Sequence, residues 1–346
     1  MNDKNSNMTG IKQIAEKLHL SPGTISIVLN GRGNKMRISR ETQNRILATA
    51  REMNYFPNIN AKRLRNGSDF IPSVALFWPL GSNPVLLERF FTGLQMVPAY
   101  QNHEVEISLV PYPNEHISDF LSRVNQDFYS GVIFMGLLEE DISQLKSDLH
   151  TDAPVVLFNR LLEKYYSVSV DDFDAGSKVA KLFAARGHQN VAIVAPEKMS
   201  RSSMLKFSGF TSACMECGML MDPSCLIRQK PTYEGGVRAA ESILDLPKDH
   251  FPTAVFFQES AQAIGALSVL HQHCIRIPEQ MEIISYGDNP QDAYTIPSLT
   301  SLRMPLEEMS RDCLKIILNH LGFRQADPVK EIYECSFIFR ESCRKA

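Results

Sequence analysis

The N-terminal segment of the chain places its apolar residues at helical spacing. One run consists of Ile11, Ile14, Ala15 and Leu18, a second of Ile25, Val28 and Leu29, and a third extends from Thr42 through Ile46, Leu47 and Ala50 to Met53. Residues three and four positions apart share one face of a helix, so each run predicts a short amphipathic helix. The break "HLS" after the first run predicts a tight turn.

Two residues at the start of the second run fit a helix start. Ser21 is suited to be the N-cap, because its side-chain oxygen can accept a hydrogen bond from a free N–H group of the first turn. Pro22 is suited to the first helical position, where its missing N–H would have had no partner anyway. The third helix is expected to begin after Ser39. Three helices with this turn predict a helix-turn-helix module, whose second helix enters the major groove of DNA.

Beyond Ser73 the pattern changes to short apolar runs that alternate with helical segments. The runs are "VALFW", "EVEISLV", "GVIFMG", "APVVLF", "NVAIVA", "SCLIRQ", "TAVFFQ" and "MEIISYG". Such alternation is typical of βαβ units, which build parallel sheets. Because eight strands are more than one compact sheet needs, we expect two lobes that divide near Asp171.

Charge divides the chain in the same place as the hydrophobic pattern. Residues 1–66 contain 12 Lys and Arg against 4 Asp and Glu, and residues 67–346 contain 24 against 35, so a segment of charge +8 precedes a body of charge −11. A basic segment attracts polyanions, because neutralised phosphates release counterions. A solvated basic surface is the alternative, and the helical pattern within the segment favours DNA.

Composition narrows the class of protein. With 346 residues, 44% of them hydrophobic, the chain can form two or three domains with real cores. The N-terminal "MNDKNSNMTG" lacks the apolar core of a secretory signal and no stretch reaches the length of a membrane span, so no membrane association and a cytoplasmic location are expected. Seven cysteines in the C-terminal half of a long chain predict reduced thiols.

The N-terminal segment also carries a family signature. The runs "IKQIAEKLHLSPGTISIVLNG" and "RETQNRILATAREMNYFPNINAKRLRNG" resemble the headpiece of the lactose/galactose repressor (LacI/GalR) family of bacterial transcription regulators. The matching positions are Ala15, Ser21, Thr24, Ile25, Ser26, Asn30, Tyr55, Pro57 and Asn58. In the body, "VSVDDFDAGSKVAKLFAARGHQNVAIVA" and "IPSLTSLRMPLEEM" resemble the family's crossovers between lobes, and "FIFRESCRKA" resembles its final strand, so the resemblance spans nearly the whole chain.

The resemblance implies a fold and its boundaries. The fold is an N-terminal all-α helix-turn-helix headpiece followed by an α/β body of two Rossmann-like lobes, as in type I periplasmic binding proteins. The implied segments are a disordered tail (1–8), the helix-turn-helix domain (9–57), a hinge helix and linker (58–72), and an effector-binding and dimerisation domain (73–346). Crossovers between the lobes are expected near residues 170, 290 and 303.

The implied function is that of a homodimeric, sequence-specific transcriptional regulator, expected to repress. Its partners would be a near-palindromic double-stranded DNA operator and a small-molecule effector in the cleft between the lobes. No cofactor, metal or catalytic residue is expected. The alternative is a solute-binding or metal-sensing protein whose basic head makes another contact.

The expected DNA contacts lie in the headpiece and hinge. They are Ser21, Pro22, Gly23, Thr24, Ser26, Ile27, Asn30, Arg32, Lys35, Arg37, Tyr55, Asn58, Ala61, Leu64 and Arg65. Family members commonly read bases with the first, second and sixth positions of the second helix, which here are Pro22, Gly23 and Ile27 and carry no hydrogen-bonding side chain. These three can read thymine methyl groups and bring the backbone close to the groove, so polar readout must come from elsewhere.

Two further segments are candidates for DNA contacts. The loop "NGRGNKMRISRET" is longer than in familiar family members and adds Arg32, Lys35 and Arg37, so we expect it to follow the DNA backbone, with Arg32 reaching a base edge. The alternative is a merely flexible basic loop. In the hinge, Leu64 matches the leucine that the family wedges into the minor groove, and a plain basic linker is the alternative.

Six residues are expected to contact the effector: Trp78, Asn159, Lys206, Tyr233, Glu259 and Asp288. Several depart from the family pattern. Lys206 stands where the family has an arginine, Glu259 and Ser260 replace an Asn-Asp pair, and in "SYGDN" a carboxylate is displaced by one position to Asp288. Lysine lacks the planar fork of arginine, so a common hexose is not favoured. Trp78 can stack on a ligand or belong to the core.

Other clusters have ordinary explanations. Cys214, Cys217 and the histidines around Cys274 can be read as a metal site, but the second ligand pair of a structural zinc site is missing and buried thiols are common in cores. Asp171, Asp172 and Asp174 fit a helix start, where carboxylates favour the helix dipole. No Ser-His-Asp set, phosphate loop or carboxylate pair typical of an enzyme stands out.

Overall fold

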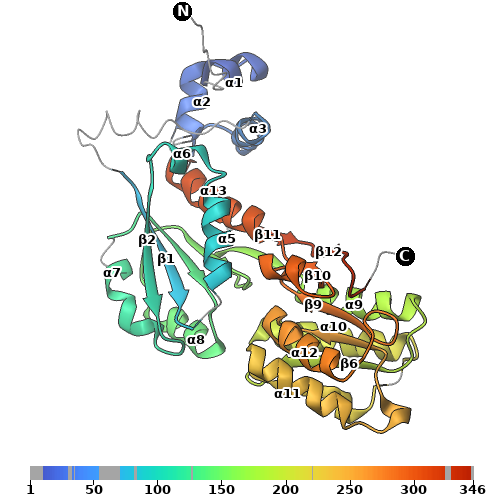
Figure 1. Cartoon of the computed structure of the whole chain (residues 1–346). Helices are drawn as coiled ribbons and strands as arrows, with labels where there is room; N and C mark the ends of the chain where they lie inside the picture. The colour runs from blue at the N-terminus through green and yellow to red at the C-terminus, as the bar shows by residue number, and fades with distance from the viewer. Residues whose placement is uncertain are drawn as a thin grey trace, which may run out of the picture. The chain divides into compact units, whose positions relative to one another are not determined.

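The computed structural model describes residues 11–29, 33–34, 36–53, 71–81, 84–125, 128–219, 221–323 and 329–343, and only the backbone of 51, 52 and 323. The body divides into two compact units (Figure 1). Unit 1 holds the described residues within 1–83, 87–168 and 307–330, and unit 2 those within 84–86, 169–306 and 331–346. The three N-terminal helices, counted with unit 1, are called the headpiece below.

The headpiece contains the three predicted helices, α1 (Ile11–Leu18), α2 (Pro22–Leu29) and α3 (Arg40–Glu52). Its core consists of the residues that the helical spacing marked: Ile14, Ala15, Ile25, Val28, Leu29, Ile46 and Ala50. The predicted helix starts are confirmed. The Ser21 hydroxyl accepts a hydrogen bond from the Thr24 N–H at 3.0 Å, and Ser39 accepts one from Thr42 at 3.2 Å.

Unit 1 is built on a six-stranded sheet in the order β11-β5-β4-β3-β1-β2. The strands are β1 (Ser73–Pro79), β2 (Glu106–Tyr112), β3 (Gly131–Met135), β4 (Val155–Phe158), β5 (Tyr166–Val170) and β11 (Lys330–Tyr333). The helices are α5 (Pro84–Leu94), α6 (Pro98–Gln101), η1 (Ile117–Phe120), α7 (Ser122–Asn125), α8 (Glu139–Asp148) and α13 (Leu306–Phe323). The strands from β1 to β5 pair in parallel, as the alternation of apolar runs and helices predicted.

The sheet of unit 1 is covered on both faces. On one face Phe77 and Phe134 pack in a cluster with Ile142 and Leu145 of α8. On the other, Phe90 of α5 packs edge-on against Trp78, with ring centroids 6.2 Å apart. Successive strand residues point to opposite faces, so an uninterrupted apolar strand is what a sheet covered on both faces requires.

Unit 2 contains a second six-stranded sheet, in the order β12-β10-β9-β8-β6-β7. The strands are β6 (Val191–Pro196), β7 (Leu226–Gln229), β8 (Ala254–Phe257), β9 (Glu282–Tyr286), β10 (Thr300–Arg303) and β12 (Ser336–Ile338), of which β12 pairs antiparallel with β10. The helices are α9 (Asp172–Ala185), α10 (Arg201–Glu216), η2 (Pro223–Cys225), α11 (Tyr233–Leu244), η3 (Lys248–His250), α12 (Ser260–Gln272) and η4 (Pro290–Tyr294).

Neighbouring phenylalanines of β8 show how the helices of unit 2 are distributed. Phe257 belongs to the cluster that includes residues of α11 and α12, whereas the ring of Phe256 lies 5.5 Å from that of Phe210 on α10. On the α10 side, α9 and α10 touch backbone to backbone, because a Cβ at Gly176 would lie 2.0 Å from the Lys206 carbonyl oxygen. This close approach brings Lys206 beside the start of α9.

The chain passes between the units after residues 83, 86, 168, 306 and 330. The crossovers expected near 170 and 303 lie close to two of these points, but the one expected near 290 does not. Residues around 290 stay in unit 2, since η4 follows β9 directly and β10 then pairs with β9. The strands β5, β10 and β11 were not among the eight predicted runs, whereas β12 overlaps the final strand expected in "FIFRESCRKA". No helix within the described ranges is long and apolar enough to cross a membrane.

Candidate DNA-binding and effector-binding sites

The second helix of the headpiece has one buried face and one accessible face. Ile25, Val28 and Leu29 of α2 are buried in the headpiece core. The residues expected to contact DNA occupy the other face: Ser21, Pro22 and Gly23 are exposed, and Thr24, Ser26 and Ile27 are partly exposed. The helical period therefore leaves these six residues accessible to a groove.

The hydroxyls at the start of α2 already have partners. Ser21 Oγ caps the helix and lies 2.8 Å from Thr24 Oγ1. These two side chains hold the first turn in place, and the exposed part of that turn is otherwise formed by Pro22 and Gly23. The accessible face of α2 thus offers a firmly capped helix end with a largely apolar first turn.

The segment between α2 and α3 forms a closed turn where the structure describes it. The Ile38 N–H donates to the Gly33 carbonyl at 2.9 Å, and the Arg37 N–H donates to the Asn34 carbonyl at 3.1 Å. Arg37 is exposed and has a φ of 55°. The remaining expected contacts of this segment, Asn30, Arg32 and Lys35, lie outside the described residues, as do Tyr55, Asn58, Ala61, Leu64 and Arg65 of the hinge and residues 1–8.

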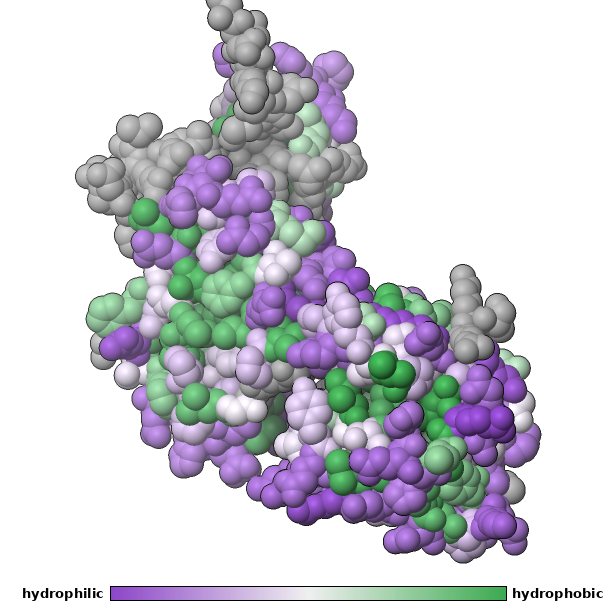
Figure 2. Space-filling view, viewed as in Figure 1, coloured by the Kyte–Doolittle hydropathy of each residue, from purple (hydrophilic) through white to green (hydrophobic). Residues whose placement is uncertain are grey.

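The described surface of the headpiece carries several basic side chains. Figure 2 shows hydrophilic residues, with some hydrophobic ones between them, on the part of the headpiece that is not grey. The exposed basic residues there include Lys12, Arg37, Arg40 and Arg45. A basic, polar surface beside a capped helix fits electrostatic attraction to a phosphate backbone.

In unit 2, Lys206 of α10 is buried, and two of its three N–H donors are hydrogen-bonded. Its Nζ donates to Asp172 Oδ1 at 3.2 Å and to Ser202 Oγ at 2.6 Å, and it lies 4.2 Å from the centre of the Tyr286 ring. An ammonium group has three N–H donors, and here two meet oxygens while the third can face the aromatic ring. Lys206 therefore already has an anionic partner, a hydroxyl partner and an aromatic partner within unit 2.

Glu259 stands next to this ion pair without a partner of its own. It occupies the N-cap position of α12, and its carboxylate makes no hydrogen bond to any described residue. Burial raises the pKa of Glu259 to about 7, although the nearby Lys206 ammonium acts in the opposite direction. The Glu259 carboxyl group is therefore the member of the cluster that can still accept a hydrogen bond from a ligand. It changes charge near neutral pH.

Two further side chains complete the surroundings of Lys206. Burial raises the pKa of the Tyr286 hydroxyl well above its usual value, and the Cys335 thiol lies beside that hydroxyl. Burial likewise raises the pKa of the Cys335 thiol to about 11. Both groups are neutral at physiological pH, so the charge of the cluster is set by Lys206, Asp172 and Glu259 alone.

The other expected effector contacts are distributed over both units. Trp78 is 7% exposed and packs on Phe90, which is the core role that the sequence left open. Asn159 follows β4 with a φ of 54°. Trp78 and Asn159 belong to unit 1. Tyr233 begins α11 in unit 2 and is 54% exposed.

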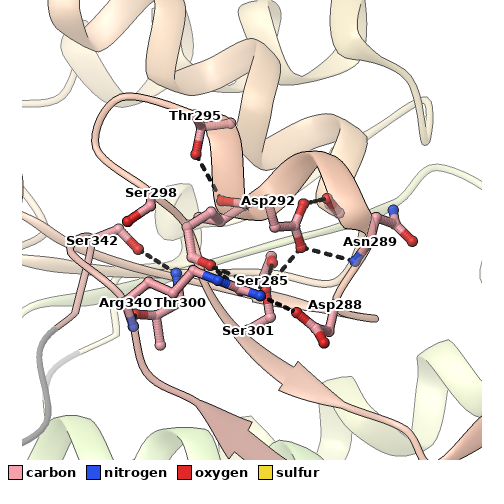
Figure 3. A network of polar contacts seen from close by, with 12 residues as sticks. Ser285, Asp288, Asn289, Asp292, Thr295, Ser298, Thr300, Ser301, Arg340 and Ser342 are labelled. Atoms are coloured by element: carbon pink, nitrogen blue, oxygen red, sulfur yellow. Dashed lines mark hydrogen bonds and ion pairs between the residues drawn. The ribbon is translucent and has the colours of Figure 1, made fainter.

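Asp288 is held in an ion pair that the sequence did not indicate. Arg340 Nη2 donates to Asp288 Oδ1 at 2.7 Å, and Arg340 Nη1 donates to the Leu299 carbonyl at 2.7 Å (Figure 3). Asp288 has a φ of 55°, so the displaced carboxylate sits on a sharp turn after β9. Oδ1 of Asp288 is therefore already hydrogen-bonded within the protein.

A network of buried polar groups supports the same turn. The carboxylate of Asp292 accepts hydrogen bonds from the Ser260 hydroxyl, from Ser301 Oγ at 2.8 Å and from the Asn289 N–H at 3.1 Å (Figure 3). Burial nevertheless raises the pKa of Asp292. These bonds join α12, β10 and the turn after β9, so they fix the edge of the sheet on which Asp288 and Glu259 lie.

Several residues of the site were missed from the sequence. Ser202, Tyr286, Cys335 and Arg340 were not singled out, and Asp172 was read only as a helix-start carboxylate. One signal was present, since Ser202 and Lys206 are four residues apart on a helix and must share a face. The contact of Arg340 with Asp288 had no local signal, because the two residues are 52 positions apart.

The clusters considered as metal sites have other roles here. Asp171 caps α9 by accepting a hydrogen bond from the Asp174 N–H at 2.9 Å, as predicted, and Asp174 pairs with Lys178 at 2.8 Å. All seven cysteines are free, and Cys214 is buried in α10. In the part of the chain that the structure describes, no three His, Cys, Asp or Glu side chains lie close enough together to hold a metal ion.

Comparisons with known proteins agree with this arrangement. The family model "Bacterial regulatory proteins, lacI family" matches residues 10–58, and the model "Periplasmic binding protein-like domain" matches residues 180–343. The chain is 25% identical to the HTH-type transcriptional repressor CytR of Escherichia coli strain K12, covering 96% of each protein. The chain belongs to the LacI family. It is also 25% identical to the probable HTH-type transcriptional repressor ExuR of Bacillus subtilis, over 98% of this chain and 99% of that protein.

Solved structures of this family share the fold. A LacI family transcription regulator from Clostridium acetobutylicum matches with a TM-score of 0.73 and 26% identity, over 78% of this chain and 99% of that one. The transcriptional regulator CelR in complex with cellobiose matches with a TM-score of 0.68 and 21% identity, over 96% of this chain and 99% of that one. This LacI-family protein is thus a DNA-binding transcriptional regulator with an effector-binding body, and the predicted fold class is confirmed.

Proposed function

We propose that this LacI-family regulator is a cytoplasmic homodimer that represses transcription by binding a near-palindromic DNA operator. The observation that carries the proposal is the headpiece, in which α2 buries Ile25, Val28 and Leu29 and leaves its other face accessible. A two-fold dimer presents two such helices to two half-sites of a palindrome. In the hinge, Leu64 would act as the minor-groove wedge, flanked by Tyr55, Asn58, Ala61 and Arg65.

The test compares DNA binding by the intact chain and by a chain without residues 1–66. Duplexes selected by the intact chain from a random library should bind it tightly and should contain an inverted repeat, and the truncated chain should not bind them. Light scattering at micromolar concentration should give a dimer. A monomer, or equal binding by the truncated chain, would contradict the proposal.

The wedge is tested separately. Leu64→Ala should weaken binding to the selected duplexes and reduce their bend, because the apolar side chain no longer unstacks a base step. Fluorescence anisotropy measures the affinity and gel mobility with permuted sites measures the bend. Unchanged affinity and bend would show that the hinge is a plain basic linker.

For the effector we propose an uncharged polar compound that donates a hydrogen bond to Glu259. The charge of Lys206 is already paired with Asp172, so a phosphate or carboxylate would find no unpaired positive charge there and would face the carboxyl groups of Asp172 and Glu259. Trp78, Asn159, Tyr233 and Asp288 remain proposed contacts. Uncharged carbohydrates are bound in two related structures, cellobiose in CelR and ribose in a regulator from Enterococcus faecium.

A thermal-shift screen tests this effector class. A compound that binds the native state raises the melting temperature, and the rise grows with the logarithm of its concentration above the Kd. We expect members of a library of neutral sugars and nucleosides, including ribose and cellobiose, to raise it, and the rise to vanish in Glu259→Ala. Stabilisation by ribose 5-phosphate but not by neutral compounds would contradict the proposal.

A further inference from the structure

We propose that the turn between α2 and α3 is a second DNA-contacting surface, in which Gln43 of α3 holds the turn so that Arg37 meets the phosphate backbone. The inference rests on the DNA binding proposed above and concerns a part of the headpiece outside the recognition helix. Gln43 is a positioning residue here, and Arg37 is the residue in contact with DNA.

The amide of Gln43 ties the two sides of the turn together. Its Nε2 donates one hydrogen bond to Asn34 Oδ1 at 3.0 Å and another to the Ile38 carbonyl at 2.7 Å. An amide nitrogen has two N–H donors, so both are used within this one turn. Gln43 lies in the first turns of α3, which is fixed to the headpiece core through Ile46 and Ala50.

Gly33 shows how closely the Gln43 side chain fits. A Cβ atom at Gly33 would lie 2.5 Å from Gln43 Cδ, so only glycine leaves room for the amide. The backbone adds two bonds of its own, from Ile38 N–H to Gly33 and from Arg37 N–H to Asn34, and Ile38 packs against the headpiece core. The turn is therefore anchored by a side chain, by its backbone and by an apolar contact, which argues against a merely flexible loop.

The chemistry of the turn points to a polyanion. From Lys17 to Arg40 the sequence contains no Asp or Glu, while residues 32–40 contain four basic residues. Arg37 is exposed on the closed turn, and Arg40 is exposed at the start of α3. Because the backbone of the turn is already held, Arg37 loses less conformational entropy on binding phosphate than it would on a flexible loop.

The test measures how strongly salt weakens binding of the full chain to a random-sequence DNA duplex. Each phosphate contact contributes a slope of about 0.9 in a plot of log affinity against log salt concentration. Arg37→Ala should lower the slope by about 0.9 per protomer. Gln43→Ala should lower it by a similar amount, although no charge has been removed, because Arg37 is no longer held in place.

Three more variants separate positioning from a loss of fold. Gly33→Ala retains Gln43 but displaces its side chain, so it should reproduce the effect of Gln43→Ala. Asn44→Ala, at the exposed neighbouring position of α3, is the matched control and should leave the slope unchanged. In the double variant Arg37→Ala/Gln43→Ala, the slope should be no lower than in Arg37→Ala alone, because coupled residues are not additive.

An unchanged slope in Gln43→Ala, or additive losses in the double variant, would overturn the role of Gln43. An unchanged slope in Arg37→Ala would overturn the surface itself. These outcomes differ from a failure of the proposed function, in which the wild-type chain would not bind the duplex at all.

Discussion

The headpiece and unit 2 differ in where their charged side chains lie, which is on the surface in the headpiece and partly in the interior in unit 2. In the headpiece every described charged side chain is at least partly exposed, and the buried residues are apolar except for Thr49. In unit 2, by contrast, Lys206, Asp172, Glu282 and Asp292 are buried. Each of these four is hydrogen-bonded to other residues of the same unit.

This difference fits two kinds of partner. Exposed charged side chains attract a polyanion such as DNA over distances of about a Debye length. They can also change conformation at little cost in free energy when they bind phosphates. Buried charges cost free energy unless they are paired, and once paired they are no longer available to a ligand. Hence the charge of a buried, paired residue in unit 2 gives little information about the effector. The carboxyl group of Glu259, which is not paired, is a better guide to the effector than the paired ammonium group of Lys206.

The largest effect is expected from breaking the buried pair. Lys206→Met should destabilise unit 2 by about 3–5 kcal/mol, because Asp172 is left charged and buried without its partner. Urea unfolding followed by circular dichroism measures the loss. The double variant Lys206→Met/Asp172→Asn is the control and should recover much of it. If Lys206→Met is as stable as the wild type, the charged pair in unit 2 is not buried and dependent on its partner, and the contrast with the headpiece fails.

Acid should weaken unit 2 through Glu282. Its carboxylate accepts hydrogen bonds from Arg186 and from His188 Nε2, and although burial acts to raise the pKa of Glu282, these bonds and that of Cys343 lower it to about 2. Because the folded-state pKa is depressed, the stabilisation is present above the usual pKa of 4.5 and is lost as pH falls towards 2.

Glu282→Gln tests this linkage. Melting temperatures recorded from pH 7 to pH 2 should be lower for the variant at pH 7, and the difference should shrink below pH 4.5 as the wild-type carboxylate is protonated. A constant difference between the two proteins across this range would contradict the assignment.

Glu259→Gln should change stability in the opposite direction to Glu282→Gln. Burial raises the pKa of Glu259 to about 7, so the wild type loses stability as pH rises from the usual 4.5 to about 7, while the variant does not. The variant should therefore equal the wild type near pH 4 and exceed it above pH 7, as measured by thermal unfolding. Equal stability of the variant and the wild type at every pH would show that the Glu259 carboxyl group is not a buried group without a partner.

The smallest effect is expected in the headpiece. Ser21→Ala removes the cap of α2 and should cost about 1 kcal/mol. Amide hydrogen exchange of residues 22–29 should accelerate accordingly, while exchange in unit 2 stays unchanged. Ser21→Asn retains a capping side chain and should restore most of the protection. Faster exchange throughout the chain would argue against an independent headpiece core.

Local patterns were enough to predict much of the fold. The helix starts at Ser21 and Ser39, the headpiece core and the eight apolar strands follow from side-chain period and capping chemistry, which involve residues close in sequence. The strands β5, β10 and β11 were missed. In β5 a local signal was present but overlooked, because "YSVSV" alternates apolar and polar residues. For β11 the pairing with β5 joins segments far apart in the sequence, so no local signal marks it.

The sequence by itself determined the family, the helix-turn-helix, the parallel sheets and the separation of a basic head from an acidic body. Only the tertiary structure decided which charges are free. Lys206 meets Asp172 across 34 residues because Gly176 lets α9 and α10 touch, and Arg340 meets Asp288 across 52. Electrostatic partners depend on distance in space, and distance in space is set by packing between elements that the sequence keeps far apart.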